Sequence, residues 1–169
     1  MKTSITIIII VAAMLKTGAQ EVNKIIFDEK AEQDILYGRC TQAAFTDPMF
    51  DSWYSFEYNG YTPKSEAITQ LNTLINGVAI KVVLGTWCGD SHREVPRFLK
   101  IISLLETNER MIIELICVNR SKTAVEAGVP EGYVEFVPTF IVSRNNVELG
   151  RIVETPIATL EEDLLNLLK

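Results

Sequence analysis

The pattern of apolar and polar residues in the second half of the chain predicts four strands. Residues 80–84 are rich in β-branched side chains, and residues 111–118 form an apolar run broken only by Glu114. Short apolar runs of this kind are typical of strands covered on both faces. Asn145-Asn146 is a tight-turn signal between two further strand-like runs, so we expect a hairpin over residues 139–153.

Helical spacing of apolar residues fills the intervals between these strands. It predicts helices over 65–75, 93–105 and 156–168, with Pro96 as a kink inside the second, and a short helix in the polar segment 121–132. The resulting order is β-α-β-α-β-β-α. Strands that alternate with helices and end in a hairpin predict an α/β fold, a central mixed sheet with helices on both faces.

The region before residue 65 has a different character. Residues 20–45 read as mostly helical, and Asp47-Pro48 marks another helix start. Aromatic side chains are then dense; they are Phe45, Phe50, Trp53, Tyr54, Phe56, Tyr58 and Tyr61. Such a cluster can form a groove or a lid over the core. We therefore expect an N-terminal helical and aromatic extension over 20–64, followed by a domain over 65–169.

The first nineteen residues resemble a secretory signal peptide. Lys2 supplies a positive start, an apolar run covers residues 5–15, and Thr17-Gly18-Ala19 offers small residues for cleavage. An uncleaved membrane anchor needs about 18 consecutive apolar residues, and this run is shorter. The pattern predicts an exported protein, periplasmic or secreted, without stable membrane insertion after cleavage of residues 1–19.

Composition restricts the classes of function. A chain of 169 residues with 47% hydrophobic residues is long enough for one domain with a substantial core. The net charge of −6 argues against nucleic acid or anionic membrane as partners, since both need a basic surface. The chain has one histidine, three separated cysteines and no glycine-rich phosphate loop. We therefore expect neither a metal site nor a cofactor.

Cys88 is the candidate reactive residue, because its position favours a nucleophilic thiol. It lies where the strand at 80–84 gives way to a helix, and the amides and dipole of a helix N-terminus favour the thiolate, the nucleophilic form. Cys117, inside an apolar run, reads as a buried core residue. An odd number of cysteines in an exported protein usually leaves one thiol free or reactive.

Trp87-Cys88-Gly89-Asp90-Ser91 resembles the Trp-Cys-Gly-Pro-Cys motif of the thioredoxin family. The β-α-β-α-β-β-α order is that of the thioredoxin fold, Pro96 corresponds to the proline of the active-site helix, and Val137-Pro138 to the cis-proline loop. The likeness covers roughly residues 65–169. The sequence most resembles exported bacterial members of the family, such as those of the Bacteroidetes, which carry an additional N-terminal region.

This resemblance implies thiol–disulfide exchange, with the catalytic thiol at Cys88. It also implies that substrate lies against a small set of neighbours: Trp87, Gly89, Asp90, Val137 and Pro138. Three departures from the family's pattern limit the exchange reaction that is expected of Cys88. Ser91 replaces the resolving cysteine, Asp90 places an anion beside the thiol, and Val82 replaces a buried aspartate.

The missing resolving thiol leaves several hypotheses open. In the first, Cys88 works as a monothiol: Ser91 donates a hydrogen bond to its thiolate, and a small external thiol completes the cycle. In the second, Cys40 resolves the mixed disulfide at Cys88. In the third, the site holds its partner through a lasting mixed disulfide. His92 either stabilises the thiolate when protonated or faces solvent on the first turn of the helix.

The function expected from the sequence is exchange on protein disulfides or mixed disulfides outside the cytosol. The partners are protein thiols or disulfides and a small thiol. The alternative is a non-catalytic binding module that holds a partner through the groove or a mixed disulfide. Peroxide reduction through a sulfenic acid at Cys88 is a third hypothesis, which no residue favours over exchange.

Overall fold

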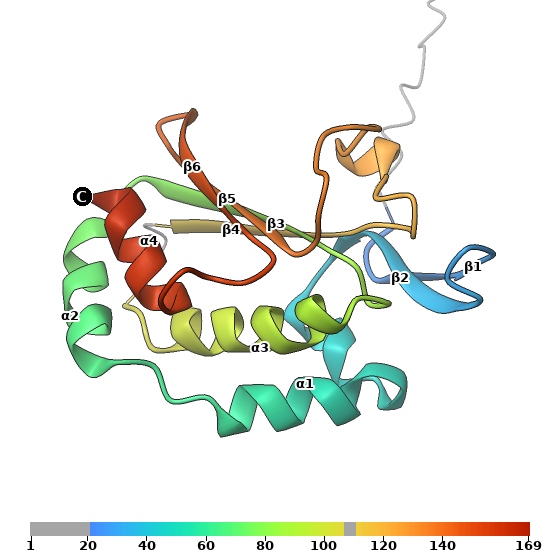
Figure 1. Cartoon of the computed structure of the whole chain (residues 1–169), viewed down its shortest axis with the longest axis horizontal. Coiled ribbons are helices and arrows are strands. Elements are labelled where there is room, and N and C mark those ends of the chain that lie inside the picture. The colour runs from blue at the N-terminus through green and yellow to red at the C-terminus, as the bar shows by residue number, and fades with distance from the viewer. Residues whose placement is uncertain (1–20, 107–110) are drawn as a thin grey trace, which may run out of the picture.

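The computed structural model describes residues 21–106 and 111–169, and it contains one six-stranded mixed sheet (Figure 1). The strand order across the sheet is β1-β2-β4-β3-β5-β6. The strands are β1 (Lys24–Asp28), β2 (Gln33–Cys40), β3 (Val78–Leu84), β4 (Met111–Cys117), β5 (Thr139–Arg144) and β6 (Val147–Val153). All four strands predicted for the second half are present.

Four α-helices and two short 3₁₀ helices connect these strands. They are α1 (Pro48–Gly60), α2 (Ser65–Leu74), α3 (Gly89–Ser103) and α4 (Leu160–Leu168), with η1 (Gln42–Thr46) and η2 (Val125–Ala127). Within the described ranges, every helix is too short or too polar to cross a membrane.

The strand pairing from β3 onward gives the fold its class. β3 runs parallel to β4 and antiparallel to β5, and β6 is antiparallel to β5. Asn145 and Asn146 have positive φ angles of 51° and 63°, the conformation that a tight hairpin turn requires. With α2, α3 and α4 in sequence order around these four strands, residues 65–169 have the thioredoxin-like fold.

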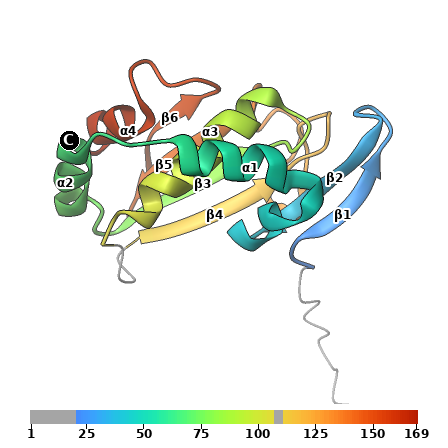
Figure 2. The same ribbon diagram turned by 90° about the horizontal axis from the view of Figure 1, so that it is seen from below.

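The two faces of the sheet are covered differently. All four α-helices contribute to one large apolar cluster on one face; Figure 2 shows α1 and α3 in front of the sheet, with α2 and α4 together at its left end. The smaller cluster on the opposite face takes its covering residues from the segment 118–137, which holds only the short helix η2. The expectation of helices on both faces is therefore corrected: the second face carries a single 3₁₀ turn.

The N-terminal region contains strands where the sequence predicted helix. β1 and β2 form an antiparallel hairpin, and β2 also pairs with β4 at the edge of the sheet. Ile35 and Leu36 are successive residues that point to opposite faces, yet both are buried. β2 pairs with β1 along one edge and, at residues 38–40, with β4 along the other, so tertiary contacts outweigh the local helical pattern. The helical part of the extension is confined to η1 and α1.

Asp28 fixes the turn of this hairpin. Its carboxylate accepts hydrogen bonds from the backbone N–H groups of Lys30 and Ala31 at 2.8 Å and from that of Arg120 at 2.9 Å. The last of these bonds ties the hairpin to the segment that follows β4. Asp28 is only 9% exposed, so its charge depends on these donors.

Helix α1 begins where the sequence predicted a start. The side chain of Asp47 accepts a hydrogen bond from Met49 N, and Pro48 occupies the first helical position. Helix α4 begins at Leu160, later than the predicted Pro156, because Thr159 is the capping residue and accepts from Glu162 N. In both cases a side-chain oxygen satisfies an amide at the helix start.

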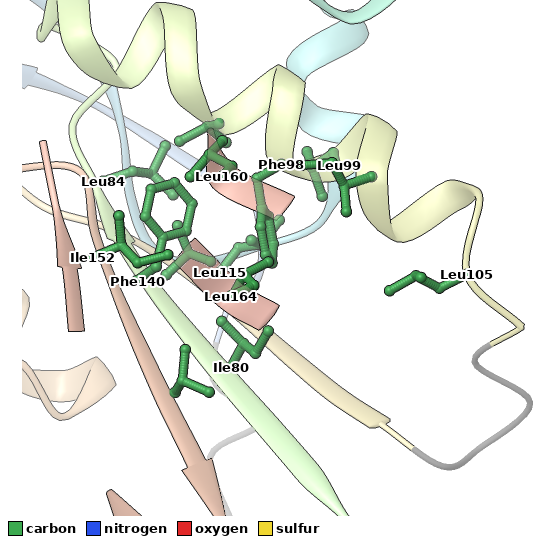
Figure 3. Packing of buried hydrophobic residues seen from close by; sticks show 14 of the residues in the cluster. Ile80, Leu84, Phe98, Leu99, Leu105, Leu115, Phe140, Ile152, Leu160 and Leu164 are labelled. Atoms are coloured by element: carbon green, nitrogen blue, oxygen red, sulfur yellow. The ribbon is translucent and has the colours of Figure 1, made fainter. Parts of the chain in front are cut away.

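The core is centred on the contact between α3 and β5 (Figure 3). Phe98 of α3 and Phe140 of β5 are both fully buried, and their ring centroids are 5.1 Å apart at a tilt of 47°. Tilted aromatic pairs at this distance are favourable beyond the area that they bury. This pair fixes α3 across the sheet and thereby sets the position of its N-terminus.

Replacing Phe98 with alanine should lower the free energy of unfolding by about 3–5 kcal/mol, because it leaves a cavity at this contact. Phe56→Ala is the matched control on α1, where the side chain is 76% exposed, and it should change stability by less than about 0.5 kcal/mol. Urea unfolding followed by circular dichroism measures both. Equal losses in the two variants would contradict the assigned core.

Burial raises the pKa of Asp28, but the backbone hydrogen bonds from Arg120, Ala31 and Lys30 outweigh it and hold the pKa below its usual value of 3.8. A folded pKa below the unfolded one stabilises the fold above about pH 4, and this stabilisation is lost as the pH falls through the folded pKa. Asp28→Asn should therefore be less stable than wild type at pH 6, with a smaller difference at pH 3. A difference that stays constant in urea unfolding would contradict this role.

Candidate active site

Cys88 lies at the junction between β3 and α3. It is the N-cap residue of α3, with φ −106° and ψ 124°, and its side chain makes no capping hydrogen bond. Its backbone N–H donates to Gly85 O at 2.9 Å, which closes the turn after the strand. The thiol is half-buried and stands at the positive end of a fifteen-residue helix.

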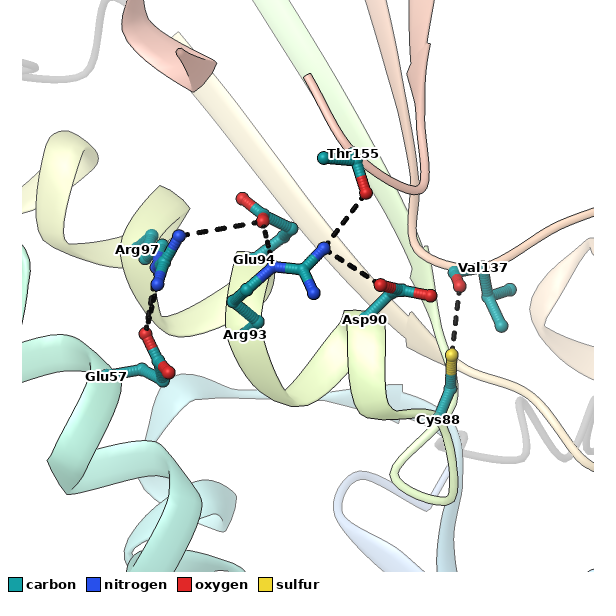
Figure 4. Close-up of polar contacts among 8 residues, drawn as sticks. All are labelled: Glu57, Cys88, Asp90, Arg93, Glu94, Arg97, Val137 and Thr155. Atoms are coloured by element: carbon teal, nitrogen blue, oxygen red, sulfur yellow. Dashed lines mark hydrogen bonds and ion pairs between the residues drawn. The ribbon is translucent and has the colours of Figure 1, made fainter. Parts of the chain in front are cut away.

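The predicted cis-proline loop faces this thiol. The Val137-Pro138 peptide bond is cis, as the resemblance implied, and the Sγ of Cys88 donates a hydrogen bond to Val137 O at 3.1 Å (Figure 4). Pro138 O accepts from Glu154 N at 2.8 Å, so the loop is tied to the end of β6. The structure thus brings Cys88, Val137 and Pro138 together from segments about fifty residues apart.

Trp87 is fixed in place beside Cys88. Its indole Nε1–H donates to Val118 O at 2.9 Å, and the guanidinium of Arg120 lies 4.4 Å from the ring centroid. The ring also lies so close to Gly85 that a Cβ at that position would be 2.5 Å from an indole carbon. Glycine at 85 is therefore a requirement of the Trp87 position.

Ser91 contacts the turn that follows β3. Its side chain is fully buried, and its Oγ accepts a hydrogen bond from Gly85 N at 3.2 Å. The hydroxyl therefore satisfies a backbone amide in the turn that precedes Cys88. Its position supports the turn, while a hydrogen bond from Ser91 to the thiolate stays a prediction.

His92 packs against the N-terminal extension. Its ring stacks on Trp53 of α1 with centroids 4.4 Å apart and an interplanar angle of 9°. Its Nε2 lies 2.8 Å from Thr86 O, and a carbonyl only accepts, so Nε2 carries a proton. The histidine joins α1 to the active-site turn instead of facing solvent, and sequence reasoning missed its partner Trp53.

Cys40 lies beside Cys117 and not beside Cys88. Cys40 ends β2, Cys117 ends β4, and their Sγ atoms are 2.8 Å apart in the interior. The hypothesis that Cys40 resolves a mixed disulfide at Cys88 is corrected by this contact. Cys117 is buried, as predicted, but no local sequence pattern indicates its thiol partner, because the two residues are 77 positions apart.

An ionic network on α3 surrounds the site on its helix side (Figure 4). Arg93 donates to Asp90 Oδ1 at 2.8 Å, to Glu94 Oε1 at 2.6 Å and to Thr155 Oγ1 at 2.9 Å. The hydrogen bond with Glu94, and after it the one with Asp90, raise the pKa of Arg93. The guanidinium thus offsets the charge of Asp90, which reduces its repulsion of a thiolate at Cys88.

The network also anchors α1. Arg97 lies 3.8 Å from Glu94 and forms an ion pair with Glu57 of α1 at 2.8 Å. Glu94 is 2% exposed, so its charge is balanced by two arginines. Sequence reasoning missed this set; the signal was the Arg93-Glu94 pair followed by Arg97, with arginines one helical turn apart.

A groove of about 380 Å³ runs between β6 and α4. Its lining includes Val153, Thr155, Ile157 and Leu167, and it does not include Cys88. It reaches the ionic network only through Thr155. Among residues 21–106 and 111–169, no group of three or more histidine, cysteine or acidic side chains could hold a metal ion.

Comparison with known proteins adds support at the level of the fold. No family model matches the sequence, and no curated protein does. The crystal structure of an HIV epitope scaffold is similar, with a TM-score of 0.52 and 16% identity over 75% of this chain and 81% of that chain.

Two further solved structures have lower TM-scores. A protein of unknown function from Pseudomonas aeruginosa gives 0.42, with 18% identity over 66% of this chain and 65% of its own. Oxidised mitochondrial thioredoxin 3 from Saccharomyces cerevisiae gives 0.35, with 21% identity over 65% of this chain and 98% of its own.

Proposed function

We propose that the protein carries out thiol–disulfide exchange through a single thiol, Cys88, on protein disulfides or mixed disulfides. One observation carries the proposal: the Sγ of Cys88 stands at the N-terminus of α3 and 3.1 Å from the carbonyl of Val137, which precedes the cis peptide bond. A helix N-terminus favours the thiolate, and the backbone opposite offers hydrogen bonds to an extended partner.

The chemistry follows from this placement. The Cys88 thiolate attacks one sulfur of a substrate disulfide, a new S–S bond forms to Cys88, and the other substrate sulfur leaves as a thiolate that takes up a proton. Once Cys88 is in a mixed disulfide, Val137 O no longer accepts from its thiol and is free to accept an N–H of the substrate. Trp87, Gly89 and Asp90 border the place where that segment would lie.

Completion of the cycle requires a second thiol from outside the chain. Ser91 has no sulfur, and Cys40 contacts Cys117. A small external thiol would attack the Cys88 sulfur of the mixed disulfide, form a new S–S bond to Cys88 and release the substrate as a thiol. A second molecule of the small thiol would then attack the sulfur of the first, which releases a small-molecule disulfide and restores the Cys88 thiol. If no such thiol gains access, the same site holds its partner, which is the binding-module alternative.

The compartment is part of the proposal. Residues 1–19, which read as a cleaved signal peptide, lie outside the described residues. We place the protein in the periplasm or outside the cell, where protein disulfides persist. Its partners there are protein thiols or disulfides together with a small thiol.

The test uses a peptide disulfide with an extended backbone. Wild type should form a stoichiometric adduct with one peptide at Cys88, detected by intact mass, and added glutathione should release it. Cys88→Ser should form none, although the small change from sulfur to oxygen preserves the shape of the site. Absence of an adduct in folded wild type would overturn the proposal, and an adduct that resists glutathione would favour the binding module.

The position of Trp87 supplies a second test. Gly85→Ala places a methyl group 2.5 Å from the present indole position, so Trp87 must move, and the rate of adduct formation should fall about tenfold or more. Gly60→Ala is the matched control, because Gly60 ends α1 away from the thiol and a Cβ there meets nothing within 4 Å. Tryptophan fluorescence reports the displacement in the first variant. Equal adduct rates in both variants would contradict a role for Trp87 at the site.

A further inference from the structure

The contact between Cys40 and Cys117 needs an explanation separate from Cys88. Cys40 is the last residue of β2 and Cys117 is the last residue of β4, and both are buried, with exposed fractions of 8% and 0%. Their sulfurs are 2.8 Å apart, about 0.8 Å longer than the S–S bond of about 2.05 Å. No exposed or charged neighbour is needed to bring them together, because the strand pairing itself does so.

The strand register places the two side chains on one face. Gly38 pairs with Cys117 and Cys40 pairs with Leu115, so the two cysteines are diagonal neighbours across β2 and β4. Diagonal residues in a regular antiparallel pair are about 7–8 Å apart, whereas Cα atoms joined by a disulfide lie about 4.4–6.8 Å apart. Gly38, the residue that pairs with Cys117, has a φ of +83°, which glycine adopts at little cost, so β2 departs from regular strand geometry beside Cys117.

We propose that Cys40 and Cys117 form a structural disulfide that fastens the N-terminal hairpin to the central sheet when the chain folds in the presence of a disulfide donor. The donor is a low-molecular-weight disulfide or the disulfide of an oxidising protein. One cysteine attacks the donor to form a mixed disulfide, and the other displaces the donor. The two cysteines lose two protons and two electrons, and the donor leaves as two thiols.

The order of events follows from burial. In the folded chain, burial first, and then the contact with Cys40, raise the pKa of the Cys117 thiol, and no donor reaches a fully buried sulfur. The bond therefore forms before the hairpin closes over β4. Once enclosed, it is shielded from external thiols, which leaves Cys88 as the single reactive thiol of the oxidised protein.

The test refolds the full chain from reductant and denaturant in a glutathione redox buffer. Free thiols are then alkylated under denaturing conditions, and the digest is mapped by mass spectrometry. The expected result is a cross-linked peptide pair containing Cys40 and Cys117, with Cys88 recovered in alkylated or glutathione-bound form. Alkylation of both Cys40 and Cys117, or a cross-link from either to Cys88, would overturn the proposal.

Two variants separate this bond from the exchange activity. Cys88→Ser removes the proposed reactive thiol and should keep the Cys40–Cys117 cross-link, so failure of one proposal leaves the other testable. Reduction in denaturant, followed by refolding in reductant, should lower the thermal midpoint of Cys88→Ser by roughly 10 °C, since a disulfide that closes a long loop restricts the unfolded chain. The double variant Cys88→Ser, Cys117→Ala should show no such shift, and an equal shift in both would contradict the assigned bond.

Discussion

The packing of α3 across the sheet through Phe98 and Phe140 determines where the candidate active site lies. Because this helix is fixed along its length by buried contacts, its N-terminus stands over the start of β5, and Cys88 meets the carbonyl of Val137 there. The thiol itself contributes little to this arrangement. The position of the thiol is therefore a consequence of where a rigid helix begins, which is how a buried core can position a side chain that remains half-exposed.

Charge around the thiol is balanced by residues on the same helix. Arg93 pairs with Asp90, so the anion next to Cys88 is partly neutralised, and Arg97 extends the same network to Glu57 of α1. The aromatic extension reaches the site from the other side through Trp53, which stacks on His92. The N-terminal region thus acts as support for the active-site turn, and the structure favours the interpretation of the aromatic cluster as a cover over the core and this turn.

How far the sequence predicts the structure depends on the range of the interactions. The β5–β6 hairpin was predictable because Asn145 and Asn146 encode the turn locally, and the site around Cys88 followed from the family resemblance. The hairpin of β1 and β2 was not, since β2 is stabilised by pairing with β4, more than seventy residues away. The contact of Cys40 with Cys117 has the same origin, because no local pattern reports which strand ends will meet.

The central claim is that the fold activates Cys88 for attack on a disulfide. The most direct measurement is the rate at which a small chromogenic disulfide reacts with Cys88 in the folded chain at pH 7, compared with the urea-unfolded chain and a free cysteine peptide as reference. The account predicts that Cys88 reacts at least severalfold faster when folded, because the N-terminus of α3 stabilises the thiolate. A folded rate equal to or below the unfolded rate would contradict it.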